Sequence, residues 1–144
     1  MVRYKKLTAT ATTPTRGSKY AAGLDLYADI SEEIIIYPGT REKIGTGIAM
    51  QIPNGYSGYI FPRSGKADKE GIRLSNCVGV IDSDYRGEIK VSLTCDDKDP
   101  QKVKPQERIG QIVILKHEME DLEEVEELDD TERGEGGFGS SGQF

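Results

Sequence analysis

Asp82 and Asp84, in the stretch "VGVIDSDYRG", are a pair of carboxylates whose placement suits general-base chemistry. They flank Ser83 in a segment rich in turn-forming residues, which predicts a hairpin corner, and alternation along an extended chain would point both carboxylates the same way. The apolar run "VGVI" just before Asp82 would partly shield its carboxylate from water, and a desolvated carboxylate is a stronger base. An ordinary solvated turn is the alternative interpretation of the same residues.

Three arginines are candidates for binding a polyanion such as a chain of phosphates. They are Arg63 in "PRSGKA", Arg108 in "RIGQI" and Arg133 in "RGEGGFGSSG". The neutral hydrogen-bond donors that accompany them are Ser64, Gly65, Gln111, Ser140 and Ser141. Guanidinium groups suit this task because they bind phosphate oxygens through two parallel hydrogen bonds. Pairing with a surface carboxylate is the alternative role for each arginine.

The charge of the whole chain limits the classes of partner. The 144 residues carry a net charge of −6, so there is no basic surplus to displace counterions from nucleic acid or from an anionic membrane. We therefore expect no general binding to either, and any bound anion must meet a local cluster of arginines. No apolar run reaches membrane-spanning length and no apolar signal segment is present, which indicates a soluble intracellular protein.

The elements that must position these residues are predicted to be short strands. Turn signals recur at short intervals, including Pro38-Gly39, Pro53-Asn54-Gly55 and Arg86-Gly87. In "EIKVSLTC" the apolar residues alternate with polar ones, as they do from Ile48 to Ile52, which indicates half-buried strands. "QIVIL" is apolar on both faces, so this strand is either central in a sheet or pressed against another chain. The pattern favours one all-β domain, a sandwich or barrel.

Two segments depart from this strand pattern. "PRSGKADKEG" predicts one short helix, capped by the Ser64 side chain and ended by Gly71. The tract from Glu118 to Asp130 holds nine acidic residues, which favours a solvated linker, whereas a short edge or exchanged strand around "LEEVEEL" is the alternative.

The two cysteines, Cys77 and Cys95, lack the spacing of a zinc site or a disulfide framework. We expect both thiols to be reduced and buried.

Five stretches, taken in order, resemble the motifs of the trimeric dUTP pyrophosphatase (dUTPase) family. They are "AAGLDLYA" (21–28), "PRSGKA" (62–67), "NCVGVIDSDYRGEI" (76–89), "RIGQI" (108–112) and "RGEGGFGSSG" (133–142), and together they span nearly the whole chain. The resemblance implies an all-β, jelly-roll-like subunit (residues 1–130) and a flexible glycine-rich tail (residues 131–144) that closes over the active site. It also implies a homotrimer with shared active sites, in which the C-terminal arm is exchanged between subunits.

The resemblance implies hydrolysis of dUTP to dUMP and pyrophosphate, which supplies dUMP for thymidylate synthesis and keeps uracil out of DNA. In similar enzymes an aspartate at the position of Asp82 orients and deprotonates the attacking water, and Gln111 and Asp25 match the other catalytic positions. Magnesium (Mg2+) rides on the phosphates and its own waters without direct protein ligands, and Asp25 could hold one of those waters.

Nucleotide binding is also assigned by the resemblance. Tyr85 would pack under the deoxyribose and exclude a 2′-hydroxyl, Asn76 would read the uracil edge, and Phe138 would stack on uracil as the tail closes. Arg63 and Gln111 would lie along the phosphate chain, and Arg133 at the γ-phosphate. The remaining binding positions are Ser64, Gly65, Gly79, Ile81, Lys90, Arg108, Gly139, Ser140 and Ser141.

Two ambiguities and two rival functions remain at this point. Arg108 could bind phosphate or instead hold Asp25. Lys66 stands where the family commonly has an apolar residue, so it could add a phosphate contact or an exposed charge. The same fold would suit a deoxycytidine triphosphate deaminase, although the "GVIDSDY" stretch fits hydrolysis better, and a non-catalytic nucleotide-sensing module is the alternative from a different class.

Overall fold

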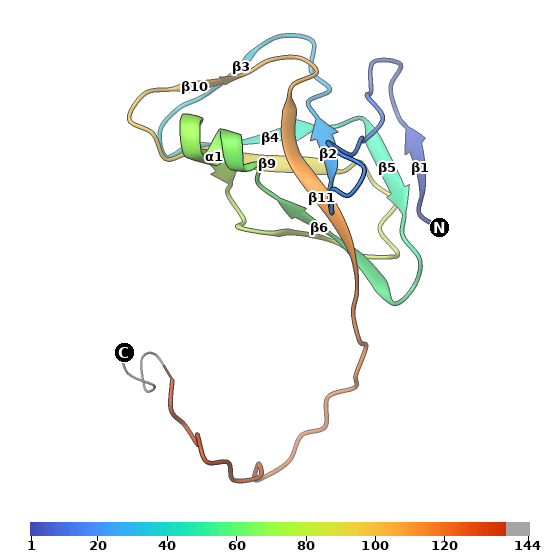
Figure 1. Ribbon diagram of the computed structural model, residues 1–144, viewed down its shortest axis with the longest axis vertical. Coiled ribbons are helices and arrows are strands. Elements are labelled where there is room, and N and C mark those ends of the chain that lie inside the picture. The colour runs from blue at the N-terminus through green and yellow to red at the C-terminus, as the bar shows by residue number, and fades with distance from the viewer. Residues whose placement is uncertain (138–144) are drawn as a thin grey trace.

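Short antiparallel strands make up nearly all the regular structure of this protein. The computed structural model describes residues 1–137 (Figure 1). Its elements are β1 (Arg3–Lys6), β2 (Leu24–Tyr27), β3 (Ile34–Ile36), β4 (Arg41–Gly45), β5 (Ile48–Gln51), β6 (Tyr56–Phe61), α1 (Ser64–Glu70), β7 (Ile72–Leu74), β8 (Gly79–Ile81), β9 (Lys90–Cys95), β10 (Gln101–Val103) and β11 (Arg108–Lys116). The all-β prediction is confirmed.

Two sheets carry the residues of functional interest. One has the strand order β2-β11-β6-β8 and the other has the order β4-β9-β7, and every pair within them is antiparallel. Strands β1 and β5 form one two-stranded sheet, and β3 and β10 form another. The apolar strand β11 lies between β2 and β6, so its central position accounts for apolar residues on both of its faces.

The core is built from the period-2 faces that the sequence indicated. Ile89, Val91, Leu93 and Cys95 are each at most 1% exposed, and the face from Ile48 to Ile52 is also buried. Each fully buried aliphatic side chain of this size contributes about 1.5–3 kcal/mol relative to an exposed one. The aliphatic core therefore holds the strand ends in place, where the polar candidates lie.

Helix α1 forms where the sequence predicted it, but its start differs. The N-cap is Arg63, with extended backbone and no side-chain capping bond, and Ser64 is already the first helical residue. The prediction that Ser64 caps the helix is therefore wrong. The end is as expected, because Gly71 takes the left-handed conformation with φ of 59°, which glycine adopts at little cost.

The predicted hairpin corner at Asp82 is also corrected by the structure. Strand β8 pairs with β6, whereas β9 pairs with β4 and β7, so β8 and β9 belong to different sheets. The segment from Asp82 to Ile89 is a connection between sheets. This difference matters for function, because a connection between two sheets leaves space between them, whereas paired strands do not.

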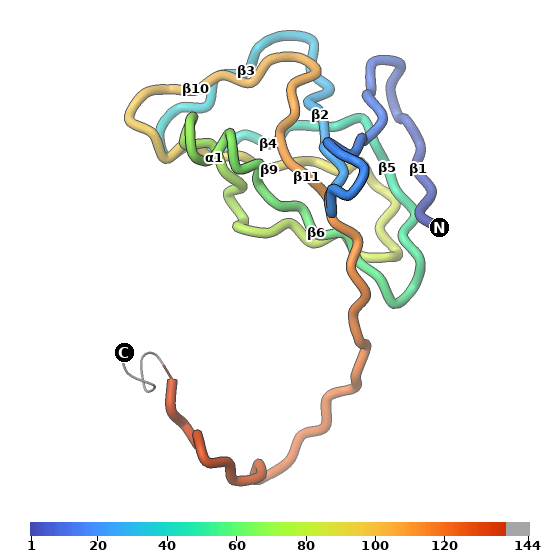
Figure 2. The backbone as a smooth tube through the Cα atoms, viewed as in Figure 1, coloured from blue at the N-terminus to red at the C-terminus, as the bar shows by residue number. Residues whose placement is uncertain are grey.

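The segment after β11 leaves the body of the domain, as the tube in Figure 2 shows. From His117 to Gly137 it contains no helix or strand, and its apolar residues Met119, Leu122, Val125 and Leu128 are 50–100% exposed. Among the described residues no helix has the length and apolar character needed to cross a membrane. Of the two thiols predicted to be buried, Cys95 is buried but Cys77 is exposed, in a left-handed turn residue with φ of 64°.

Candidate active site

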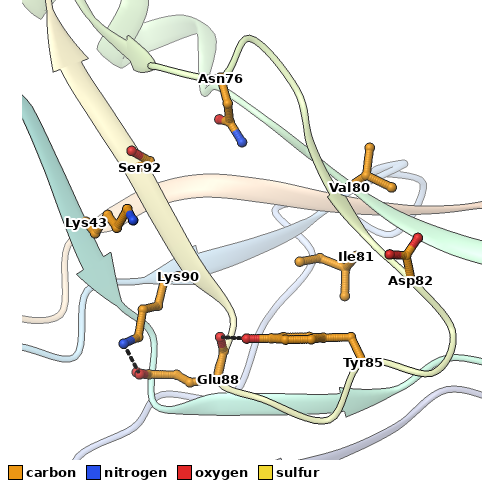
Figure 3. Close-up of a pocket in the computed structure, with 9 residues that line it drawn as sticks. All are labelled: Lys43, Asn76, Val80, Ile81, Asp82, Tyr85, Glu88, Lys90 and Ser92. Carbon is orange, nitrogen blue, oxygen red and sulfur yellow. Dashed lines mark hydrogen bonds and ion pairs between the residues drawn. The ribbon is translucent and has the colours of Figure 1, made fainter.

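A pocket of about 340 Å³ lies between β8 and β9, at the connection that joins the two sheets (Figure 3). Its walls are Lys43, Asn76, Val80, Ile81, Asp82, Tyr85, Glu88, Lys90 and Ser92. A cavity of this size is in the range of small-molecule sites, which pair apolar walls with a few polar groups. The pocket brings together five of the predicted binding residues, which are Asn76, Ile81, Asp82, Tyr85 and Lys90.

Tyr85 forms one side of this pocket and is held in place by its own turn. Its hydroxyl donates a hydrogen bond of 2.9 Å to the carbonyl oxygen of Glu88, and Figure 3 shows the ring lying across the pocket toward that residue. A Cβ atom at Gly87 would approach the Tyr85 hydroxyl oxygen to 2.4 Å, so only glycine fits beneath the ring. Tyr85 is 42% exposed, which leaves a ring face available to a ligand.

Four pocket residues were not predicted as site residues from the sequence, namely Lys43, Val80, Glu88 and Ser92. Glu88 accepts a hydrogen bond of 3.0 Å from the amide of Gly47 and lies 3.5 Å from the ammonium of Lys90. Ser92 shares the solvent face of β9 with Lys90, so the period-2 pattern could have indicated it. Lys43 lies opposite Ser92 in the β4–β9 register, a long-range pairing that no local pattern reveals.

Asp82 lies at the edge of the pocket, beside Val80 in Figure 3. Its side chain is exposed, and it makes no hydrogen bond or ion pair with any other residue in the range 1–137. The expectation that the preceding apolar run desolvates this carboxylate is therefore wrong for the single chain. The physical reason is that the run does not cover this carboxylate, because Val80 is itself 55% exposed and the adjacent Ile81 is only partly buried.

A second polar group lies at the neighbouring ends of β2, β6 and β11, and consists of Asp25, Arg63, Arg108 and Gln111. We call it the arginine cluster. Arg63 Nε lies 3.0 Å from Asp25 Oδ1, and Arg108 Nη1 lies 3.5 Å from Asp25 Oδ2. The Gln111 side-chain amide donates a hydrogen bond of 3.0 Å to the carbonyl oxygen of Pro62, just before Arg63.

Sheet register explains how residues so distant in sequence meet in the arginine cluster. Gln111 lies opposite Asp25 in the β11–β2 pair and opposite Phe61 in the β11–β6 pair. Gly23 must lack a side chain, because a Cβ atom there would come within 2.7 Å of the Gln111 Oε1 atom. These constraints fix Gln111 between the two strands that carry the acidic and basic partners.

Both arginines contact Asp25, so one of the two roles considered for Arg108 is present in the single chain. The Asp25 residue is only 8% exposed, whereas the side chains of Arg63 and Arg108 are 34% and 46% exposed. Each guanidinium carries five N–H donors, so exposed donors remain for an incoming anion. Ser64 and Gly65 are exposed directly after Arg63, which adds neutral donors at the same edge.

The pocket and the arginine cluster lie apart within one chain. On β6, the pocket residues Ile81 and Val80 lie opposite Gly58 and Tyr59, whereas Gln111 of the cluster lies opposite Phe61. Two to three residues of extended chain, or about 7–10 Å along the strand, separate these positions. The two groups share no residue, and within residues 1–137 no hydrogen bond or ion pair joins them.

Arg133 joins neither group. It is exposed on the C-terminal segment, and its Nε atom donates a hydrogen bond of 2.8 Å to the carbonyl oxygen of Gly136. The predicted tail residues Phe138, Gly139, Ser140 and Ser141 lie outside the described residues.

Lys66 follows neither of the two roles considered from the sequence. It is 4% exposed and forms ion pairs of 2.7 Å with both Glu70 and Glu107. Burial by itself raises the pKa of the Glu107 carboxyl, but hydrogen bonds from the Lys66 ammonium and the Lys104 amide together hold that pKa below its usual range.

The side chains around Asp25 can be compared with the ligands that a magnesium site requires. Within residues 1–137 no three His, Cys, Asp or Glu side chains come close enough to form a metal site. Both Asp25 carboxylate oxygens already contact arginines. Asp25 is the carboxylate of the arginine cluster that could hold a water of a magnesium ion, because this ion dehydrates reluctantly and usually keeps several of its own waters.

Comparisons with known proteins identify the family of this chain. The dUTPase family model matches residues 9–142. The deoxyuridine 5'-triphosphate nucleotidohydrolase of Nautilia profundicola is 50% identical over 142 residues, which cover 99% of each chain. The structure of the dUTPase of Staphylococcus bacteriophage 80alpha with dUpNHpp has a TM-score of 0.85 at 30% identity and covers 99% of this chain and 98% of that one. The structure of a mutant dUTPase from phage phi11 of S. aureus, which describes the coordination of a structural Mg(II) ion, has a TM-score of 0.78 at 22% identity. The match covers 88% of this chain and 97% of that chain, and it shows the same fold. The chain therefore belongs to the dUTPase family.

Proposed function

We propose that this protein hydrolyses dUTP to dUMP and pyrophosphate. The observation that carries the proposal is the presence, in one member of the dUTPase family, of both a nucleoside-sized pocket and a separate cluster of exposed arginine donors. The relatives named above act on, or were solved with, deoxyuridine nucleotides. These two groups match the two halves of such a nucleotide.

Asn76 and Tyr85 recognise the nucleoside in this proposal. The Asn76 amide offers both a donor and an acceptor, which is the pattern needed to bind the imide edge of uracil. Ile81 lines the same pocket, and Gly79, two residues before it in β8, is assigned to the same recognition through its backbone. The Tyr85 ring packs under the deoxyribose and leaves no room for a 2′-hydroxyl, so ribonucleotides are excluded.

Asp82 supplies the base. Its exposed carboxylate accepts a proton from a water molecule, and the water oxygen forms a bond to the α-phosphorus while the bond to the bridging oxygen breaks and pyrophosphate leaves. Arg63, Arg108 and Gln111 hold the phosphates and stabilise the charge that develops on the leaving group. Bound magnesium, with Asp25 holding one of its waters, would add further neutralisation of the phosphate charge.

A complete active site needs more than one subunit in this proposal. The pocket and the arginine cluster share no residue and are not joined by a hydrogen bond or ion pair among the described residues. We therefore assign the nucleotide to a site between neighbouring copies of a homotrimer, the assembly that the family resemblance implies. The tail of a subunit, residues 131–144, then closes over a shared site with Arg133 at the γ-phosphate and Phe138, Gly139, Ser140 and Ser141 around the nucleotide.

The exchange of the C-terminal arm has a physical basis on the surface of the domain. A groove of about 390 Å³ is lined by the cations Arg3, Lys5 and Arg86 around Tyr4 and Met50. The acidic segment 118–130 offers the opposite charge, and its apolar residues are 50–100% exposed in the single chain. We therefore assign this groove to the arm of a neighbouring copy.

The deciding experiment measures pyrophosphate release from dUTP, dTTP, dCTP and UTP at equal concentrations with magnesium. We expect release from dUTP to exceed release from the other three by at least about 10²-fold, because a site built on hydrogen bonds rejects ligands that leave those bonds unmade. Equal rates on all four nucleotides would contradict the proposal. Ammonia release from dCTP would instead indicate a deaminase, and nucleotide binding without turnover would indicate a sensing module.

A further inference from the structure

Helix α1 is attached to the domain in an unusual way, because its one buried residue is a lysine. The helix spans Ser64–Glu70 and is too short to be stable in water by itself, so it depends on tertiary contacts. An apolar side chain usually provides such a contact. Here the only buried residue of the helix is Lys66.

The Lys66 ammonium bridges two carboxylates that come from different elements. It lies 2.7 Å from Glu70 Oε2, one turn further along the same helix. It also lies 2.7 Å from Glu107 Oε1, in the turn that precedes β11. The lysine side chain is 5% exposed, while those of Glu70 and Glu107 are 38% and 30% exposed. Only the second ion pair connects the helix to another part of the fold.

Glu107 is itself held by contacts of both its side chain and its backbone. Besides the pair with Lys66, its Oε2 atom accepts a hydrogen bond of 2.8 Å from the backbone amide of Lys104. Its carbonyl oxygen accepts one of 2.8 Å from the amide of Ala28, which directly follows β2. Glu107 also immediately precedes Arg108. It is therefore fixed to both strands that carry the acidic and basic members of the arginine cluster.

The contacts of Lys66 and Gln111 bracket the start of α1. On one side, the Gln111 amide bonds to the carbonyl oxygen of Pro62. On the other, Lys66 bonds to Glu107. Arg63 and Ser64 lie between these two attachment points. Their position relative to β11 thus depends on both.

We propose that Lys66 is a positioning residue of the phosphate site, whose ion pair with Glu107 sets Arg63 and Ser64 at the correct distance from Arg108 and Gln111. The assignment rests on the proposed function, because it concerns the same phosphates. Buried ion pairs of this kind contribute little net stability but impose a defined geometry, since a lone buried charge is costly. Loss of the Glu107 pair should thus weaken phosphate binding more than it weakens nucleoside binding.

The test compares Glu107→Gln with Glu70→Gln, which removes the other 2.7 Å pair of the same lysine but leaves the helix connected to the turn. Inhibition of dUTP hydrolysis is measured with two probes, magnesium pyrophosphate and deoxyuridine. For Glu107→Gln we expect the inhibition constant of pyrophosphate to rise about tenfold or more, since small displacements of binding groups have large effects. The constant for deoxyuridine should change less than about twofold, as should both constants in Glu70→Gln. Equal responses of the two variants, or equal loss of both probes, would overturn the assignment.

A second test is a double-mutant cycle that combines Lys66→Met with Glu107→Gln and measures pyrophosphate binding in each variant. If Lys66 and Glu107 act through one ion pair, the double variant should bind pyrophosphate no more weakly than Lys66→Met alone. If the fold-losses of pyrophosphate affinity in the two single variants multiply in the double variant, the residues act independently and the proposal is refuted. The activity of the wild-type protein distinguishes failure of the proposed function from failure of the positioning role. Without dUTP hydrolysis by the wild type the proposed function is wrong, whereas an active wild type with an unchanged Glu107→Gln variant defeats only the positioning role.

Discussion

Arg63 Nε and Asp25 Oδ1 are 3.0 Å apart, although the arginine precedes helix α1 and the aspartate lies in β2. The second oxygen of the same carboxylate faces Arg108 at 3.5 Å. One nearly buried aspartate thus orients two guanidinium groups whose outer donors remain exposed. A preorganised pair of arginines loses less conformational freedom when it binds an anion, which favours tight binding of phosphates.

Replacing Asp25 should disorganise this pair. Asp25→Asn keeps the shape of the side chain but removes the charge, so Arg63 and Arg108 would repel each other without a counterion. We expect kcat/KM for dUTP to fall at least about tenfold, and the free energy of unfolding in urea to fall by about 1–3 kcal/mol. Asp96→Asn, which breaks the exposed pair with Arg73, is the matched control and should leave both measurements near the wild-type values.

Asp82→Asn should slow the hydrolysis of dUTP without weakening nucleotide binding. The amide cannot accept a proton from water, so kcat for pyrophosphate release should fall roughly 10²–10⁴-fold. The dissociation constant of a non-hydrolysable dUTP analogue should stay within a few-fold of the wild type, as measured by calorimetry. Asp84→Asn alters an exposed carboxylate of the same connection and serves as the control. A comparable loss in both variants would contradict the assignment of the base.

Ending the chain at Glu132 should remove tail closure without disturbing the β domain. Sedimentation should still report a trimer, because the arm residues 118–130 are retained. Hydrolysis of dUTP should fall by at least about 10²-fold, since Arg133 and the closing residues are lost. Full activity in the truncated protein would show that the tail is dispensable.

Gly58 lies in β6 at a position where the core leaves no room for a side chain. A Cβ atom there would come within 2.7 Å of Ile112 Cδ1 and 3.0 Å of Ile52 Cδ1, both in the buried core. Gly58→Ala should therefore lower the free energy of unfolding by about 1–3 kcal/mol through overpacking. Gly137→Ala, where a Cβ atom meets nothing within 4 Å, should leave the urea midpoint unchanged.

The Lys66–Glu107 pair should contribute an acid-dependent part of stability. The pKa of Glu107 is depressed in the folded protein, so its contribution is present above the ordinary glutamate pKa of about 4.3 and is lost as pH falls toward the depressed folded value. The group facing it from α1 is Lys66, which also contacts Glu70, and Lys104 faces it from its own turn. The loss of thermal stability between pH 5 and pH 3 should thus be smaller in Glu107→Gln than in the wild type. An identical pH profile would exclude this contribution.

Local sequence patterns predicted where helix and strands form better than they predicted which strands pair. Alternation identified the buried face of β9, and Gly71 marked the end of α1, because both signals depend on residues a few positions apart. The capping role of Ser64 was wrong because the chain enters the helix one residue earlier than the sequence pattern suggests. The pairing of β8 with β9 was wrong because the choice between neighbouring strands depends on contacts with β6, β4 and β7, which the turn residues do not encode.

The sequence by itself determined which chemistry is available: arginines with neutral donors, an aspartate beside an apolar run, and the five ordered stretches that mark the family. The tertiary structure decided where that chemistry lies. Sheet register, which depends on hydrogen bonds between strands far apart in the chain, brought Asp25, Arg63, Arg108 and Gln111 together. The same register kept Asp82 and Tyr85 apart from them, and burial placed Lys66 in an ion pair with Glu107. These outcomes require the complete fold because each depends on the packing of several strands at once.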